Sequence, residues 1–102
     1  MASRPASSGK VIVFATVTAK PGKADELEKL LQPAIANANS SAEPGTLTYR
    51  CARHGEEFRL FEEYESASAI KHHQTQEAYK KLGKSGLAAG VKVEFFQEIP
   101  KL

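Results

Sequence analysis

The alternation of hydrophobic and polar positions along the chain predicts four β-strands. Residues 11–19 are rich in β-branched side chains, a composition that favours a strand. Residues 46–54 and 58–64 each alternate apolar and polar side chains and flank a tight connection, a pattern typical of a β-hairpin. A last strand is expected at residues 91–99, where mostly apolar side chains recur at every second position.

Two further segments carry the period of a helix that buries one face. In residues 24–39 the apolar side chains recur at intervals of three and four residues. The side chains that share this face are Leu27, Leu30, Leu31, Ala34, Ile35 and Ala38. Residues 66–82 are expected to form one continuous second helix. Its apolar side holds Ala67, Ile70, Ala78 and Leu82.

The predicted order of elements is β-α-β-β-α-β, which is typical of the α+β class. In this ferredoxin-like fold two helices cover one face of an antiparallel sheet. The strands offer apolar groups to both faces, because Phe14 and Phe96 alternate with Val13 and Phe95. A sheet that is apolar on both faces needs a second cover, so the sequence predicts a homodimer in which residues 91–99 take part.

Length and charge narrow the choice of function. The 102 residues fit a single domain at residues 11–102, after a tail at residues 1–10 whose Ser, Pro and Gly content predicts flexibility. The 14 basic and 12 acidic residues give a net charge of +2 without a basic stripe, which argues against nucleic acid or a membrane surface as a partner. The longest apolar run, residues 11–17, is too short to span a membrane.

The cysteine content and the C-terminal tripeptide give information on the cellular compartment of the protein. The single cysteine, Cys51, excludes an internal disulfide framework and a cysteine-based zinc cluster, and it fits a reducing compartment. We therefore expect a cytoplasmic protein. The final tripeptide Pro100-Lys101-Leu102 differs from the peroxisomal signal Ser-Lys-Leu at its first position.

Two adjacent histidines lie in the predicted second helix. Neighbouring helical positions differ by about 100°, so His72 and His73 point in different directions and cannot chelate one metal ion together. His73 falls between Ala69 and Ile70 on the helical wheel, at the margin of the buried face, whereas His72 is expected to face solvent. His73 is then either a core histidine with a satisfied ring or an acid/base group that faces a pocket.

The paired carboxylates Glu62 and Glu63 lie in one strand and point to opposite faces of the sheet. Glu62 shares its face with Phe58, Leu60 and Tyr64, so it is the carboxylate expected to point inward. A buried carboxylate needs a partner or stays protonated. Two interpretations remain open. One is a structural ion pair with Arg50 or Arg53 on the neighbouring strand, and the other is a polar group in a ligand cavity.

Three tyrosines complete the candidate site. Tyr49, Tyr64 and Tyr79 could line a pocket with their aromatic faces, or they could be amphipathic core residues. Strand alternation places Leu47, Tyr49 and Cys51 on one face. The chain contains no glycine-rich phosphate loop, no serine nucleophile elbow and no triplet of metal ligands, so we expect no flavin, haem or metal cofactor.

The residues around these positions resemble the signature of the antibiotic biosynthesis monooxygenase (ABM) family. That signature has a Glu, an aromatic residue two positions on, an Ala, a His eleven positions after the Glu, and an aromatic residue six positions after the His. The matching residues here are Glu62, Tyr64, Ala69, His73 and Tyr79. Lys20-Pro21-Gly22 before a helix and Glu43-Pro44-Gly45 before a strand agree with the family as well. The resemblance extends over residues 11–99.

The resemblance implies a dimeric α+β barrel, in which two ferredoxin-like units join through their sheets and each encloses a cavity between helices and sheet. It also implies a monooxygenase that uses O2 without flavin, haem or metal. Its substrate would be a small aromatic, quinol or enolisable compound. His73 would be the candidate base and Glu62 a second catalytic residue, and Tyr49, Tyr64 and Tyr79 would bind the substrate.

The chain also departs from the better-known members of that family. The polyketide oxygenases and the haem-degrading branch use an Asn and a Trp, but this chain has no Trp. Its two asparagines, Asn37 and Asn39, fall at the end of the predicted first helix. The alternative is therefore a non-catalytic dimeric module of the same fold, with a ligand-binding or stress-response role.

Overall fold

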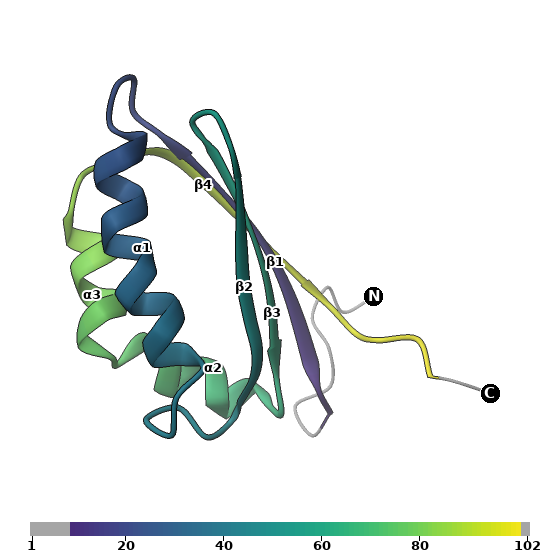
Figure 1. Ribbon diagram of the computed structural model, residues 1–102. Helices are drawn as coiled ribbons and strands as arrows, with labels where there is room; N and C mark the ends of the chain where they lie inside the picture. The colour runs from purple at the N-terminus through teal and green to yellow at the C-terminus, as the bar shows by residue number, and fades with distance from the viewer. Residues whose placement is uncertain (1–8, 101–102) are drawn as a thin grey trace.

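The computed structural model describes residues 9–100, which form one sheet with helices on a single face (Figure 1). The elements in chain order are β1 (Val11–Ala19), α1 (Ala24–Ala38), β2 (Thr46–His54), β3 (Glu57–Tyr64), α2 (Ala67–Gln74), α3 (Glu77–Lys84) and β4 (Ala88–Phe96). Most of the predicted tail, and the last two residues of the final tripeptide, lie outside the described residues. None of the helices in residues 9–100 is long and apolar enough to cross a membrane.

The four strands are arranged in the order β2-β3-β1-β4, and every neighbouring pair is antiparallel. The register places Val13 opposite Glu62 on β3 and opposite Phe95 on β4. β3 and β1 are therefore the two central strands, and β4 lies at the edge of the sheet next to β1, as the split βαβ pattern requires. This arrangement confirms the predicted α+β ferredoxin-like fold.

The predicted second helix, residues 66–82, is wrong in one respect, because it is divided into α2 and α3. The backbone of Gln76 is extended, with ψ of 142°. Thr75 ends α2 by donating its hydroxyl hydrogen to the carbonyl oxygen of His72 at 2.6 Å. A short polar side chain that bonds the backbone in this way competes with continued helix. Residues 9–100 therefore form three helices on one face of the sheet, not two.

The predicted last strand is displaced along the chain. It runs over Ala88–Phe96 and not over residues 91–99. Its partner explains the shift, because β1 continues to Ala19, which pairs with Ala88, and the pairing ends where Ile12 meets Phe96. Ile99, predicted within the strand, is 86% exposed.

The predicted face of β2 is interrupted near its start. Leu47 is 45% exposed, although the alternation placed it on the same face as the buried Tyr49. The pairing with β3 shifts between Thr46 and Thr48, so Leu47 is an extra residue at a bulge. β3 begins at Glu57, one residue before the predicted start.

The core lies between the helices and the sheet. The predicted apolar face of α1 is confirmed, since Leu27, Leu31, Ala34 and Ala38 are buried. The main cluster joins α1 to side chains of β1, β2 and β3, and a smaller cluster surrounds Tyr64 beneath α2. Side chains on the inner face of β1, β2 and β3 therefore meet the helices, whereas Val91, Val93 and Phe95 on the same face of β4 are exposed.

Candidate functional site

A cavity of about 210 Å³ lies between the helices and the sheet. Apolar side chains of β1 and β4 form much of one wall, and Leu27 and Leu31 of α1 contribute to the other. All of the predicted site residues line this cavity. They are Tyr49, Glu62, Tyr64, His73 and Tyr79. Elements far apart in the sequence thus bring these side chains together around one space.

His73 is buried more deeply than its place at the margin of the helical wheel predicted, with 3% of its surface exposed. The ring is surrounded by aromatic side chains, with centroid distances of 5.0 Å to Tyr49, 5.9 Å to Tyr64 and 4.9 Å to Tyr79. One ring nitrogen, Nδ1, lies 2.7 Å from Oε1 of Glu43. The other, Nε2, is buried and has no hydrogen-bond partner among residues 9–100.

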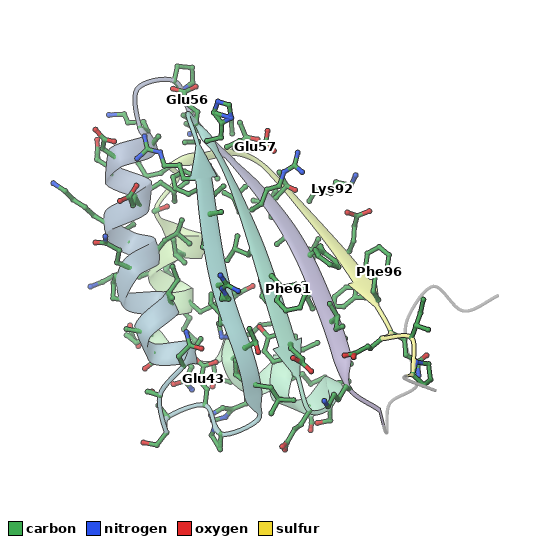
Figure 2. The ribbon with its side chains drawn as sticks, turned by 45° about the vertical axis from the view of Figure 1, so that its right-hand side comes forward. Glu43, Glu56, Glu57, Phe61, Lys92 and Phe96 are labelled. Atoms are coloured by element: carbon green, nitrogen blue, oxygen red, sulfur yellow. The ribbon has the colours of Figure 1, made fainter. Side chains whose placement is uncertain are left out.

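Glu43 is the site residue that sequence reasoning missed. It lies in the loop between α1 and β2 (Figure 2), and only 2% of its surface is exposed. Its carboxyl group accepts hydrogen bonds from Nδ2 of Asn37 at 2.7 Å and from the hydroxyl group of Thr46 at 3.1 Å. The available signal was the Glu43-Pro44-Gly45 motif before the second strand, because nothing periodic marks a buried carboxylate in a loop.

The other donors to Glu43 indicate which nitrogen of His73 carries a proton. Asn37 and Thr46 both donate to Glu43, so its carboxyl group acts as an acceptor, and Nδ1–H of His73 donates to the same group. In the neutral form of an imidazole with its proton on Nδ1, the free lone pair is on Nε2. In that form, Nε2 is the proton acceptor that the site offers.

Glu62 points inward as predicted and is 8% exposed, but neither predicted ion pair forms. Arg50 lies opposite Phe61 in the register, on the other face of the sheet. Arg53 instead contacts Glu28 at 2.7 Å and Asp25 at 3.0 Å, both on α1. The ion-pair interpretation is therefore wrong.

The partner of Glu62 is a phenol. The hydroxyl group of Tyr64 donates to Oε1 of Glu62 at 2.6 Å. Burial raises the pKa of Glu62 to about 7, because desolvation disfavours the charged form. The hydrogen bond from Tyr64 lowers this pKa, and the nearby charge of Glu43 raises it. Glu62 is thus a carboxyl group that carries its proton for much of the time at neutral pH.

Tyr49 and Tyr64 remain neutral in this environment. Burial, and next the negative charge of Glu62, raise the pKa of Tyr49 and of Tyr64 well above the ordinary value of a phenol. Tyr79 on α3 is half-buried, and its ring meets the edge of His73 at 65°. The three rings give the cavity aromatic walls with hydroxyl tips.

Comparison with known proteins adds a family to this geometry. The sequence profile of the family described as antibiotic biosynthesis monooxygenase, ABM, matches residues 10–84. The chain belongs to the ABM family. Comparison with curated proteins gives no match.

Solved structures similar to this ABM protein share its fold over nearly their whole length. A Caulobacter crescentus protein with the provisional name of antibiotic biosynthesis monooxygenase is 29% identical, with a TM-score of 0.81 over 92% of this chain and 93% of that one. PA3566 of Pseudomonas aeruginosa is 28% identical, with a TM-score of 0.82 over 94% of this chain and 100% of that one. Rv0793 of Mycobacterium tuberculosis is 26% identical, with a TM-score of 0.81 over 91% of this chain and 98% of that one.

Other reactive side chains of this ABM protein lie outside the cavity. His72 is exposed as predicted, and its Nε2 lies 2.8 Å from the carbonyl oxygen of Ala42. Cys51 is half-buried, and burial raises the pKa of its thiol to about 11, which disfavours the nucleophilic thiolate. Residues 9–100 contain no group of three His, Cys, Asp or Glu side chains placed to hold a metal ion.

Proposed function

We propose that this chain is a cofactor-independent monooxygenase that oxygenates a small aromatic, quinol or enolisable substrate with O2. The observation that carries this proposal is that Nε2 of His73 is buried and has no hydrogen-bond partner within the described residues. His73 lines a cavity with mostly apolar walls, and its other ring nitrogen lies 2.7 Å from a buried carboxyl group. A histidine oriented in this way is the arrangement of a general base.

His73 would start the reaction by removing a proton. Ground-state O2 reacts slowly with a closed-shell substrate, but an enolate gives up an electron more easily than its neutral form. Nε2 takes the proton from an acidic CH2 group, and the enolate transfers one electron to O2. The two radicals join at that carbon, and loss of one water leaves a carbonyl group, so CH2 and O2 become C=O and H2O. Glu43 stabilises the imidazolium that holds the proton.

The walls of the cavity suit a flat and mostly apolar ligand. Its volume of about 210 Å³ is below the roughly 300–1,000 Å³ of ligand pockets in general, which favours a substrate of one or two rings. Tyr49, Tyr64 and Tyr79 would hold the ring between them. The mostly apolar walls offer few polar groups that could hold water next to the radical pair, and the exposed side chains Val91, Val93 and Phe95 of β4 border the open side of the cavity.

The test measures oxygen uptake with a panel of hydroquinones and enolisable ketones of one or two rings. Replacing His73 with Ala should lower turnover by roughly 10²–10⁴-fold, the usual contribution of a general base. His72→Ala is the matched control and should leave turnover unchanged, because His72 faces away from the cavity. Equal rates for wild type and His73→Ala would contradict the proposal.

A binding module of the same fold predicts another result. The absence of Trp, which other oxygenases of the family use, favours this second candidate. It predicts no oxygen uptake with any compound of the panel. The effect of His73→Ala would then be a loss of about 1–2 kcal/mol in the free energy of unfolding, through the hydrogen bond to Glu43. Thermal unfolding measured beside the uptake separates the two candidates.

A further inference from the structure

Glu62 is a buried acid that the oxygenation reaction does not use. It lies on β3 in the sheet, whereas His73 lies on α2 in the helical layer, and both side chains line the same cavity. A ligand in the cavity therefore lies between a base on one wall and a carboxyl group on the other. Tyr64 fixes Oε1 of Glu62 at 2.6 Å, while Oε2 has no hydrogen bond within residues 9–100.

Apart from the hydrogen bond from Tyr64, the described lining of the cavity offers little that would hold Glu62 as a carboxylate. None of the side chains that line it in the described part of the chain is a Lys or an Arg. The titratable groups around Glu62 are Tyr49 and Cys51 on β2, Tyr64 on β3, His73 on α2 and Tyr79 on α3, with Glu43 acting through its charge. Burial and the charge of Glu43 both raise the pKa of Glu62, so the surroundings favour the protonated acid.

A base and a neutral acid on opposite sides of a bound ketone are the requirements for enolisation. The base removes a proton from the carbon next to the carbonyl group, and negative charge develops on the carbonyl oxygen. An acid that donates its proton to this oxygen completes the enol. Reversal of the two transfers returns a ketone, and neither direction consumes an oxidant or a reductant.

We propose that the cavity also catalyses keto–enol tautomerisation of small ketones in the absence of O2. Nε2 of His73 removes the α-proton, and Glu62 donates its proton to the carbonyl oxygen. This activity rests on the role of His73 as base in the proposed function, and it assigns Glu62 the role of proton donor. The ligands would be uncharged cyclic ketones of one or two rings with an acidic α-CH group, because the cavity is small and largely apolar.

The experiment follows hydrogen exchange without oxygen. The probe is 2-tetralone in D2O under anaerobic conditions, and NMR records the loss of the α-proton signal with and without protein. We expect the protein to accelerate exchange above the buffer rate. His73→Ala should lower this acceleration by roughly 10²–10⁴-fold, and Glu62→Gln by roughly 10²-fold, because a Gln side chain keeps the shape but transfers no proton. Glu63→Gln is the matched control, because Glu63 lies on the opposite face of the same strand.

The pH dependence distinguishes proton donation from a merely structural role. Glu62 donates only when protonated, so the exchange rate should fall as the pH rises through about 7, which is its pKa. Glu62→Gln should lose this dependence. Tyr64→Phe removes the hydrogen bond that lowers the pKa of Glu62, so the fall in rate should move to higher pH.

The outcomes separate this inference from the proposed function. Oxygen uptake with quinols but no accelerated exchange would overturn the tautomerase and leave the oxygenase standing. Accelerated exchange without oxygen uptake would support the tautomerase and remove the oxygenase. An unchanged rate and pH profile in Glu62→Gln would overturn the role of Glu62.

Discussion

The state of His73 depends on Glu43, which lies 30 positions earlier in the chain. A buried polar atom without a partner costs about 1–3 kcal/mol, and Nε2 of His73 is such an atom. The hydrogen bonds around Glu43 hold the ring in place despite this cost, since Asn37 and Thr46 fix the carboxylate on which Nδ1 rests. A substrate that places its proton next to Nε2 would give this nitrogen a hydrogen-bond partner.

This dependence predicts the effect of Glu43→Gln. The Gln side chain fills the same space but removes the charge that stabilises the imidazolium. The rate of oxygen uptake should fall at least about tenfold, and by less than the roughly 10²–10⁴-fold loss of His73→Ala. The ¹⁵N chemical shifts of the His73 ring report which nitrogen carries the proton, and they should show loss of the single Nδ1–H form. Glu65→Gln, at an exposed position in the same region, is the control. A variant with unchanged rate and shifts would refute the role of Glu43.

Periodicity predicted the site residues that lie on regular elements. Strand alternation alone places Glu62 and Tyr64 on one face, and helical spacing alone places His73 beside the core. The partners of these residues were not predictable in the same way. Glu43 lies in a loop, and the choice of Tyr64 over an arginine as partner of Glu62 depends on which face Arg50 takes in the observed register.

The loop between α1 and β2, which carries Glu43, reaches the site through a close contact at Gly45. A Cβ atom added to Gly45 would lie 2.6 Å from Cβ of Ala69, so the loop that carries Glu43 touches α2 directly. The amide of Glu65 also donates to the carbonyl oxygen of Gly45 at 2.9 Å. A glycine at position 45 is therefore what lets Glu43 approach His73.

Gly45→Ala should destabilise the protein. The new methyl group must displace α2 or the loop, at a cost of about 1–3 kcal/mol in the free energy of unfolding. Gly83→Ala is the matched control, because a Cβ atom at Gly83 in α3 meets nothing within 4 Å. It should leave stability unchanged or raise it by about 0.5–1 kcal/mol, the usual difference between Gly and Ala in a helix. Chemical unfolding measures both, and equal stability of the two variants would show that the contact at Gly45 imposes no constraint.

The existence and order of the elements were predictable from the sequence, and their ends were less so. The composition of residues 11–19 marked β1 correctly, since local propensity and tertiary pairing agree there. The start of β4 at Ala88 depends on its pairing with Ala19, and the break between α2 and α3 depends on the hydroxyl group of Thr75. The first is a contact with a distant segment, and the second is a local hydrogen bond that the apolar periodicity does not encode.

The sheet face opposite the helices carries an exposed cluster of aromatic side chains. The rings of Phe14, Phe61 and Phe96 form edge-to-face pairs there, with centroid distances of 5.5 Å and 5.3 Å from Phe14. Figure 2 shows Phe61 and Phe96 on this side of the sheet, away from the helices. Phe14 is 44% exposed and Phe96 is 48% exposed, so this aromatic cluster has no cover within the described chain. A contiguous apolar surface of this kind marks an interaction site.

We propose that a second copy of the chain covers the aromatic cluster. A small domain buries a modest core, and a symmetric dimer pairs the same patch on both subunits. Light scattering at micromolar concentration should therefore give twice the 11.1 kDa mass of the chain. Phe14→Glu should shift the mass toward that of the monomer, because a two-fold interface would bury two unpaired charges. Ala36→Glu, on the exposed side of α1, should leave the dimer intact. Circular dichroism would establish that Phe14→Glu still folds, as expected for a half-exposed position. If the wild-type protein had the mass of a single chain, the proposed dimer would be wrong.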